Sequence, residues 1–224
     1  MTPYAFSFAG ALLHALPSGA LHWPDQSLLV VADLHLGKSE RLARRGGSLL
    51  PPYETRATLA KLDADIAKTA ARSVICLGDS FDDTPACDAL DAADGLWLAA
   101  LMAGRDWTWV AGNHDPGPVG PGGNHRAEVR HPSLTLRHIA SAETPDISGH
   151  YHPKARLAGQ ARPCFLIDDT RVILPAYGTY TGGMACNDPV LMALMKRGAV
   201  AVLTGHTTRV IPMPRGQTKP NPPR

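Results

Sequence analysis

Three short apolar runs that each end in polar residues constrain the fold of this chain most. Residues 27–32, 73–77 and 107–111 are rich in Val, Leu, Ile and Trp, which is typical of buried strands. The segments between them, 53–71 and 87–102, have the apolar spacing of helices. Strands that alternate with helices in this order predict a parallel α/β sheet. The carboxyl ends of its strands then carry Asp33, Gly78-Asp79 and Gly112-Asn113.

The second half of the chain has a different pattern. A Pro/Gly-rich loop at 116–123 is followed by four shorter β-type runs, at 133–137, 164–167, 171–174 and 199–204. Asp168-Asp169 lies between two of these runs and is typical of a hairpin turn. These features predict a second, more antiparallel sheet.

Length and composition favour one folded domain. We expect it to occupy residues 1–211 of the 224, followed by a disordered tail at 212–224 that contains five prolines. With 44% hydrophobic and 19% charged residues, the chain resembles an ordinary globular protein. A net charge of +2 does not by itself indicate a nucleic-acid partner.

The apolar runs, the amino terminus and the cysteines together predict where in the cell the protein works. The longest runs, near 28–32 and 199–203, are strand-sized, so we expect no transmembrane segment and no membrane partner. The amino terminus lacks the pattern of a secretory signal, which predicts a cytoplasmic protein. The four cysteines show no CxxC spacing and are expected to be small buried residues rather than disulfides or zinc ligands.

Histidines, aspartates and an asparagine gather in four short clusters. They are Asp33-Leu34-His35, Gly78-Asp79-Ser80-Phe81-Asp82, Gly112-Asn113-His114-Asp115 and Gly149-His150-Tyr151-His152. Oxygen and imidazole ligands of this kind suit manganese, iron or zinc. Asp79, at the end of the middle strand, is placed to bridge two ions about 3.5–4 Å apart, as in two-metal hydrolytic sites. The clusters therefore predict a centre with two divalent metal ions.

The ordered clusters, with an isolated histidine before the last one, resemble the binuclear calcineurin-like metallophosphoesterase superfamily. The resemblance runs from Asp33 to His152. It implies a four-layer α/β/β/α sandwich of two mixed β-sheets, with the metals at the sheet ends. Carried over residue by residue, it assigns one metal to Asp33, His35, Asp79 and His152, and the other to Asp79, Asn113, His138 and His150.

Four segments resemble a narrower group, the ligase-associated DNA damage response endonucleases. They are residues 33–39, 149–153, 162–165 and 174–183. This resemblance implies a manganese-dependent endonuclease that acts on single-stranded DNA in bacterial repair, beside a DNA ligase or helicase system. Two positions depart from the group pattern: Asp82 stands where the group has a histidine, and Ile139-Ala140 follow His138 where the group has Glu-Pro.

The isolated ligand has alternatives in the sequence. His125 and His131 also lie between the third and fourth clusters, in or beside the Pro/Gly-rich loop. His138 ends a β-type run, as the other candidate ligands do, so we assign it first and His131 second.

His114 is a candidate catalytic residue. Next to the candidate ligand Asn113, it is expected to face the scissile phosphate and donate a proton to the leaving oxygen. Asp82 or Asp115 would hold its second ring nitrogen. A metal-activated water would be the nucleophile, so no side chain is required for attack. The alternative is a histidine that only stabilises the turn.

A basic cluster follows the first motif: Lys38, Arg41, Arg44 and Arg45. Beside a phosphoesterase centre it suggests contacts with a polyanionic backbone. The alternative is an ordinary solvated face.

Two other functions remain open at this point. The same metal centre serves nucleotide and cyclic-nucleotide phosphodiesterases and phosphomonoesterases. A non-catalytic scaffold on this fold is a further alternative, against which the full ligand set and His114 argue.

Overall fold

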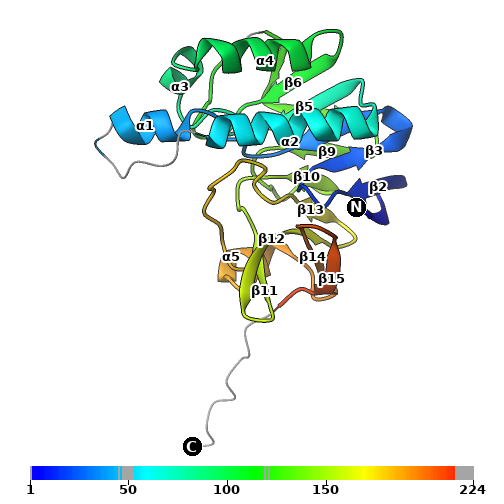
Figure 1. The fold of residues 1–224 in the computed structure, drawn as a ribbon. Helices are drawn as coiled ribbons and strands as arrows, with labels where there is room; N and C mark the ends of the chain where they lie inside the picture. The colour runs from blue at the N-terminus through cyan, green and yellow to red at the C-terminus, as the bar shows by residue number, and fades with distance from the viewer. Residues whose placement is uncertain (1, 45, 47–52, 119, 121, 215–224) are drawn as a thin grey trace, which may run out of the picture.

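The computed structural model describes residues 2–44, 46, 53–118, 120 and 122–214 as two facing β-sheets with helices outside them (Figure 1). The first sheet has the order β1-β2-β3-β4-β5-β6-β7. Its strands are β1 (Tyr4–Phe8), β2 (Ala11–Ala15), β3 (Leu21–Trp23), β4 (Leu28–Val31), β5 (Ser73–Leu77), β6 (Asp106–Val110) and β7 (Asn124–Arg126). From β4 to β7 the strands are parallel, and from β1 to β4 they are antiparallel.

The second sheet has the order β15-β14-β12-β13-β10-β9-β8, with β11 paired to β12. Its strands are β8 (Glu128–His131), β9 (Leu134–Arg137), β10 (Asp146–Ser148), β11 (Lys154–Leu157), β12 (Gln160–Ile167), β13 (Arg171–Ile173), β14 (Val200–Leu203) and β15 (Arg209–Pro212). The pairs β9–β10 and β10–β13 are parallel, and the other pairs of this sheet are antiparallel. The prediction of a second, more antiparallel sheet is confirmed.

Three apolar clusters define the layers. One lies between the two sheets, where Val30 and Leu77 meet Phe165 and Val202. The second packs α2 (Glu54–Thr69) and α4 (Ala92–Met102) on the outer face of the first sheet. The third packs the short helix α5 (Pro189–Leu194) on the outer face of the second sheet. The predicted α/β/β/α sandwich is therefore present, with a thin fourth layer.

The helices differ from the sequence prediction in two places. The expected helix 87–102 is divided into α3 (Thr84–Asp88) and α4, because the Asp91 carboxylate accepts the backbone N–H of Ala93 at 2.9 Å and caps α4. The helix α1 (Lys38–Arg44) was not predicted. It carries part of the basic cluster.

The carboxyl end of the fold extends past the expected boundary at residue 211. Pro212 ends β15, and Met213 is buried with its backbone N–H bonded to Ala199 O at 2.9 Å. The predicted boundary thus falls inside a strand. Residues 215–224 of the predicted tail lie outside the described residues.

Three of the four cysteines are buried, as expected, and Cys87 is half-buried. Cys164 and Cys186 lie with their Sγ atoms 3.4 Å apart under α5. Among the described segments, no helix is long and apolar enough to cross a membrane.

Candidate metal centre

The two sheets bring the four sequence clusters to one edge of the sandwich. Asp33, Asp79 and Asn113 follow the carboxyl ends of the parallel strands β4, β5 and β6. His138 and the 149–152 cluster follow β9 and β10, which are also parallel to each other. Because parallel strands end at the same edge, residues more than a hundred positions apart meet there.

The first group of candidate ligands contains Asp33, His35 and His152, whose ligand atoms lie within 4.8 Å of one another. Asp33 Oδ1 is 3.2 Å from His152 Nε2, and the Nε2 atoms of His35 and His152 are 3.5 Å apart. Asp33 is fully buried, and its Oδ1 has no hydrogen-bond partner among the described residues. A buried carboxylate oxygen without a donor, beside two imidazole nitrogens, fits a divalent cation.

The second group contains Asp79, His138 and His150. His138 Nδ1 donates to Leu77 O at 2.8 Å, so Nε2 is the ring atom that faces the other groups. That Nε2 is 3.0 Å from Asn113 Oδ1, 3.4 Å from Asp79 Oδ2 and 3.2 Å from His150 Nδ1. A ring nitrogen among two oxygens and a second nitrogen is the arrangement expected around a cation.

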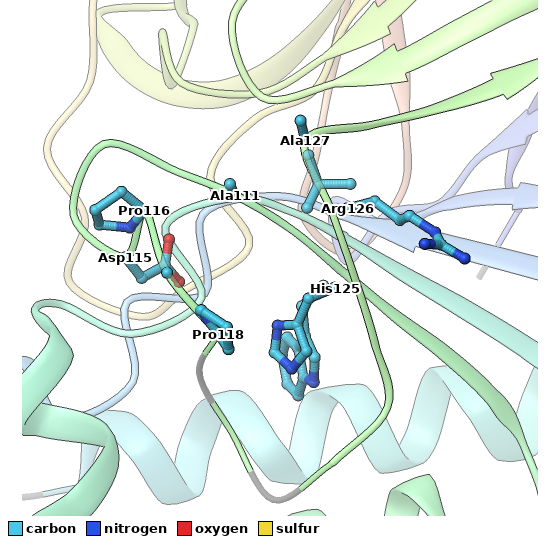
Figure 2. A pocket seen from close by; sticks show the side chains of 10 residues that line it. Ala111, Asp115, Pro116, Pro118, His125, Arg126 and Ala127 are labelled. Atoms are coloured by element: carbon cyan, nitrogen blue, oxygen red, sulfur yellow. The ribbon is translucent and has the colours of Figure 1, made fainter.

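The structure brings His138, and neither of its two alternatives, to this group. His131 packs its ring on Trp23 with the centroids 4.7 Å apart and contacts Ser133 Oγ at 3.1 Å. His125 lies on β7 in a separate cavity of about 220 Å³, between the 115–118 loop and Arg126 (Figure 2).

Five of the seven candidate ligands have a left-handed backbone that is unfavourable for residues other than glycine. Their φ angles are 55° at Asp33, 47° at His35, 46° at Asp79, 71° at His150 and 46° at His152. Strain of this kind persists only where the surrounding structure holds it, and it is typical of functional sites.

The glycines that precede the ligands in the motifs allow close approach. A Cβ on Gly112 would lie 2.1 Å from Asp79 N, and a Cβ on Gly149 would lie 2.6 Å from Asp33 Oδ2. The Gly-Asn and Gly-His pairs of the motifs thus have a steric cause.

Charge at the site favours an ionised Asp79 and a neutral His150. Burial would lower the pKa of His138, but Asp79 and Asp33 raise it. Burial would raise the pKa of Asp79, but its contacts with His138 and with the backbone N–H of His114 hold that pKa well below its usual range. Burial and the neighbouring His138 lower the pKa of His150. Asp79 and His150 are therefore in the state that binds a cation.

His114 lies at the side of the first group. Its Nδ1 donates to the main-chain oxygen of Asp82 at 2.8 Å, and its ring meets the His35 ring edge to face at 5.3 Å. Asp82, one of the two residues expected to hold the second ring nitrogen of His114, does so through its main-chain oxygen rather than its carboxylate. The Nε2 atom of His114 is left for other contacts.

Asp115 has a different role from the one expected. Its buried carboxylate accepts the backbone N–H groups of Asp79, Ser80 and Phe81 at 2.9, 2.7 and 3.1 Å. It thereby shapes the loop that presents Asp79. Figure 2 shows it beside Pro116 in the wall of the neighbouring cavity.

Asp82 contacts the other side of the first group. One of its oxygens is 2.9 Å from His35 Nδ1, and the other accepts from Arg41 Nη1 at 2.6 Å. Burial would raise the pKa of Asp82, but His35 and Arg41 lower it to about 2. An ionised Asp82 orients His35 so that its Nε2 faces the cluster.

Comparison with known proteins supports the chemistry that this edge suggests. Residues 27–209 match the model of the calcineurin-like phosphoesterase family. The chain belongs to this family. It is also similar to the crystal structure of Pseudomonas putida nuclease MPE, with 28% identity, a TM-score of 0.70, and coverage of 90% of this chain and 96% of that one. No curated protein sequence matches it.

Membership makes the chain a phosphoester-hydrolysing enzyme of a family that uses divalent metal ions. Three histidine–carboxylate groups among the described residues could hold a metal ion: the two described above and a third of His35, Asp82 and His114. The first two contain the residues that the sequence motifs assign as ligands.

The basic cluster of this phosphoesterase is largely paired with carboxylates. Arg41 is held by Asp82, and Arg44 contacts Glu40 Oε1 at 2.6 Å and Asp83 Oδ1 at 2.8 Å. Lys38 begins α1, and Arg45 lies outside the described residues. Sequence reasoning missed these ion pairs because the partners lie about 40 residues further along the chain, apart from Glu40 on the same helix.

Proposed function

We propose that this phosphoesterase is a manganese-dependent phosphodiesterase that cuts single-stranded DNA endonucleolytically during DNA repair. The observation that carries the proposal is the likeness to a nuclease over nearly the whole chain, in a structure that assembles both candidate metal groups. The four segments that resemble the ligase-associated endonucleases, residues 33–39, 149–153, 162–165 and 174–183, support the single-stranded DNA substrate and the role in repair. We further propose that the protein works in the cytoplasm with a DNA ligase or helicase system.

The residues present fit two divalent ions. Asp33, His35 and His152 would hold one, Asn113, His138 and His150 the other, and Asp79 would contact both. Such ions activate water and polarise a phosphoryl oxygen. Their nitrogen and oxygen donors suit manganese and, equally by chemistry, iron or zinc.

The chain's own groups prepare the proton transfer. The Asp82 carbonyl holds the proton on His114 Nδ1, so Nε2 is the atom that can carry a second proton to the leaving oxygen. The ionised Asp82 carboxylate keeps His35 in place beside it. Asp33 and Asp79 are buried, so bulk solvent does not reach their carboxylates.

The proposal is tested with three substrates in parallel: circular single-stranded DNA, a cyclic nucleotide and bis(4-nitrophenyl) phosphate. With manganese, we expect the circle to become linear, which only an internal cut can do, and EDTA to stop the reaction. Turnover of the cyclic nucleotide with an intact circle would overturn the DNA assignment and support the nucleotide phosphodiesterase alternative.

A further inference from the structure

A cavity of about 350 Å³ lies beside the candidate metal centre. Its walls come from the β2–β3 turn at Ser18, the start of β12, the segment after β13 and the residues after β14. The strand directions place all four at the edge where β4 ends, because β3 and β12 begin there and β13 and β14 end there. Gly178, in its wall, donates its backbone N–H to Asp33 O at 3.0 Å.

The charge of this cavity suits an anion. Among the residues that the structure describes, Lys61 is the one charged residue that lines it, and no carboxylate does. The Lys61 amine lies 4.0 Å from the centre of the Tyr177 ring and donates to Tyr177 O. Another cavity, lined in part by α1 and α2, has more acidic walls, since Glu40, Glu54, Asp91 and Asp94 line it together with Arg56.

Tyr180 gives the cavity an exposed aromatic ring. Its side chain is 53% exposed, and its backbone has a φ of 58°, which is unfavourable for a bulky residue. The flanking residues hold it there: Thr179 N donates to Thr58 Oγ1 at 3.1 Å, and Thr181 Oγ1 donates to Gly178 O at 3.3 Å. Strain that presents an aromatic ring to solvent at a cavity points to a binding role.

We propose that this cavity binds one nucleotide of the DNA strand next to the scissile phosphate, with the Tyr180 ring stacked on its base. Lys61 favours the anionic strand. The inference rests on the proposed function, because it takes the strand to be single-stranded DNA. Unpaired bases stack on aromatic side chains with little regard to sequence, and the cavity volume is in the range of ligand sites.

The first test compares variants at Tyr180. Tyr180→Ala is expected to raise the KM for single-stranded DNA roughly 5- to 100-fold, whereas Tyr180→Phe stays near wild type because it keeps the ring. Turnover of bis(4-nitrophenyl) phosphate should be unchanged in both. Tyr53→Ala is the matched control, since Tyr53 is also exposed but lines the acidic cavity. An equal loss on both substrates would overturn the subsite and assign Tyr180 to the support of the metal loop.

The second test locates the nucleotide. Oligonucleotides that each lack one base, at successive positions around the cut, are cleaved by the wild type and by Tyr180→Ala. We expect one abasic position to raise the wild-type KM and to have no further effect in the variant, because both changes remove the same contact. Additive effects would overturn the subsite while leaving the nuclease in place. Failure of the wild type to cut single-stranded DNA would overturn the proposed function itself.

Discussion

At the scale of single residues, the site depends on atoms held close together by strained backbone. The sequence predicts which side chains meet, because Asp33, Asp79 and Asn113 each follow a strand-type run. It does not predict the left-handed angles at Asp33 or His152, since these follow from the packing of both sheets. The sequence does not show that Asp82 holds His114 by its carbonyl or that Asp115 binds the 79–81 backbone, because main-chain contacts leave no pattern in side-chain spacing.

His114 is the residue whose role is easiest to isolate. Its Nδ1 is held by a carbonyl, and it clusters with His35 and Asp82 rather than with the groups that contain Asp33 and Asp79. We expect His114→Ala to lower kcat on single-stranded DNA by about 10²- to 10⁴-fold, as for the loss of a general acid. Metal content, measured by mass spectrometry, should stay at the wild-type level.

The control for the His114 prediction is a change at a second histidine. His125→Ala alters a histidine in the cavity of Figure 2, away from both groups, and should retain wild-type activity. If His114→Ala instead loses a bound ion, His114 is a ligand and the proton-transfer role is wrong.

At the scale of elements, helix α2 supports the metal edge through the segment 174–183. Tyr177 OH donates to Asp65 on α2 at 2.8 Å, and Tyr177 N donates to Ala32 O at 2.7 Å. The segment thereby ties the helix to the loop that carries Asp33. This explains physically why a motif without metal ligands lies beside the site.

Lys61 on α2, which donates to Tyr177 O, makes the free energy of unfolding depend on pH. Burial lowers its pKa to about 8, so above that pH the folded chain releases a proton that the unfolded chain keeps until its ordinary pKa. The free energy of unfolding should therefore rise with pH between about 8 and 10.5, by about 1–3 kcal/mol from this group. Urea unfolding across this window should show a smaller rise for Lys61→Met.

The same helix offers a comparison for that experiment. Lys68→Met also removes one lysine from α2, at an exposed position, and is the matched variant to compare with Lys61→Met. Identical slopes for the wild type and Lys61→Met would mean that Lys61 keeps its ordinary pKa.

The elements themselves were predictable where burial is two-sided. The strands β4, β5 and β6 were found because each is covered on both faces and forms a continuous apolar run. The strands β1 to β3 were missed because exposed residues such as Leu12 and polar ones such as His14 and His22 interrupt the apolar pattern. Sheet pairing rather than local preference forms them: β3 pairs with β4, β2 with β3 and β1 with β2.

At the scale of the whole molecule, electrostatics act mainly through local groups. The net charge is +2, and two arginines beside the centre are paired with carboxylates. No carboxylate among the residues that the structure describes pairs with Lys38, which begins the same helix.

This difference predicts unequal effects on DNA binding. Lys38→Ala should reduce the magnitude of the log–log salt slope for single-stranded DNA by about 0.7, the value for one phosphate contact. Arg44→Ala should leave the slope unchanged, because Glu40 and Asp83 already neutralise its guanidinium. Fluorescence anisotropy over a salt series measures both, and a reduced slope for Arg44→Ala would return that residue to the DNA surface.

The proposed DNA cleavage depends on two metal ions that act together at the edge of the sheets. The direct measurement is a titration of metal-free protein with manganese, in which bound metal per chain and linearisation of circular single-stranded DNA are followed in the same samples. We expect cleavage to rise as the second ion binds, and Asp79→Ala to bind fewer ions and leave the circle intact. Full cleavage with one ion per chain, or an intact circle with two, would contradict the account.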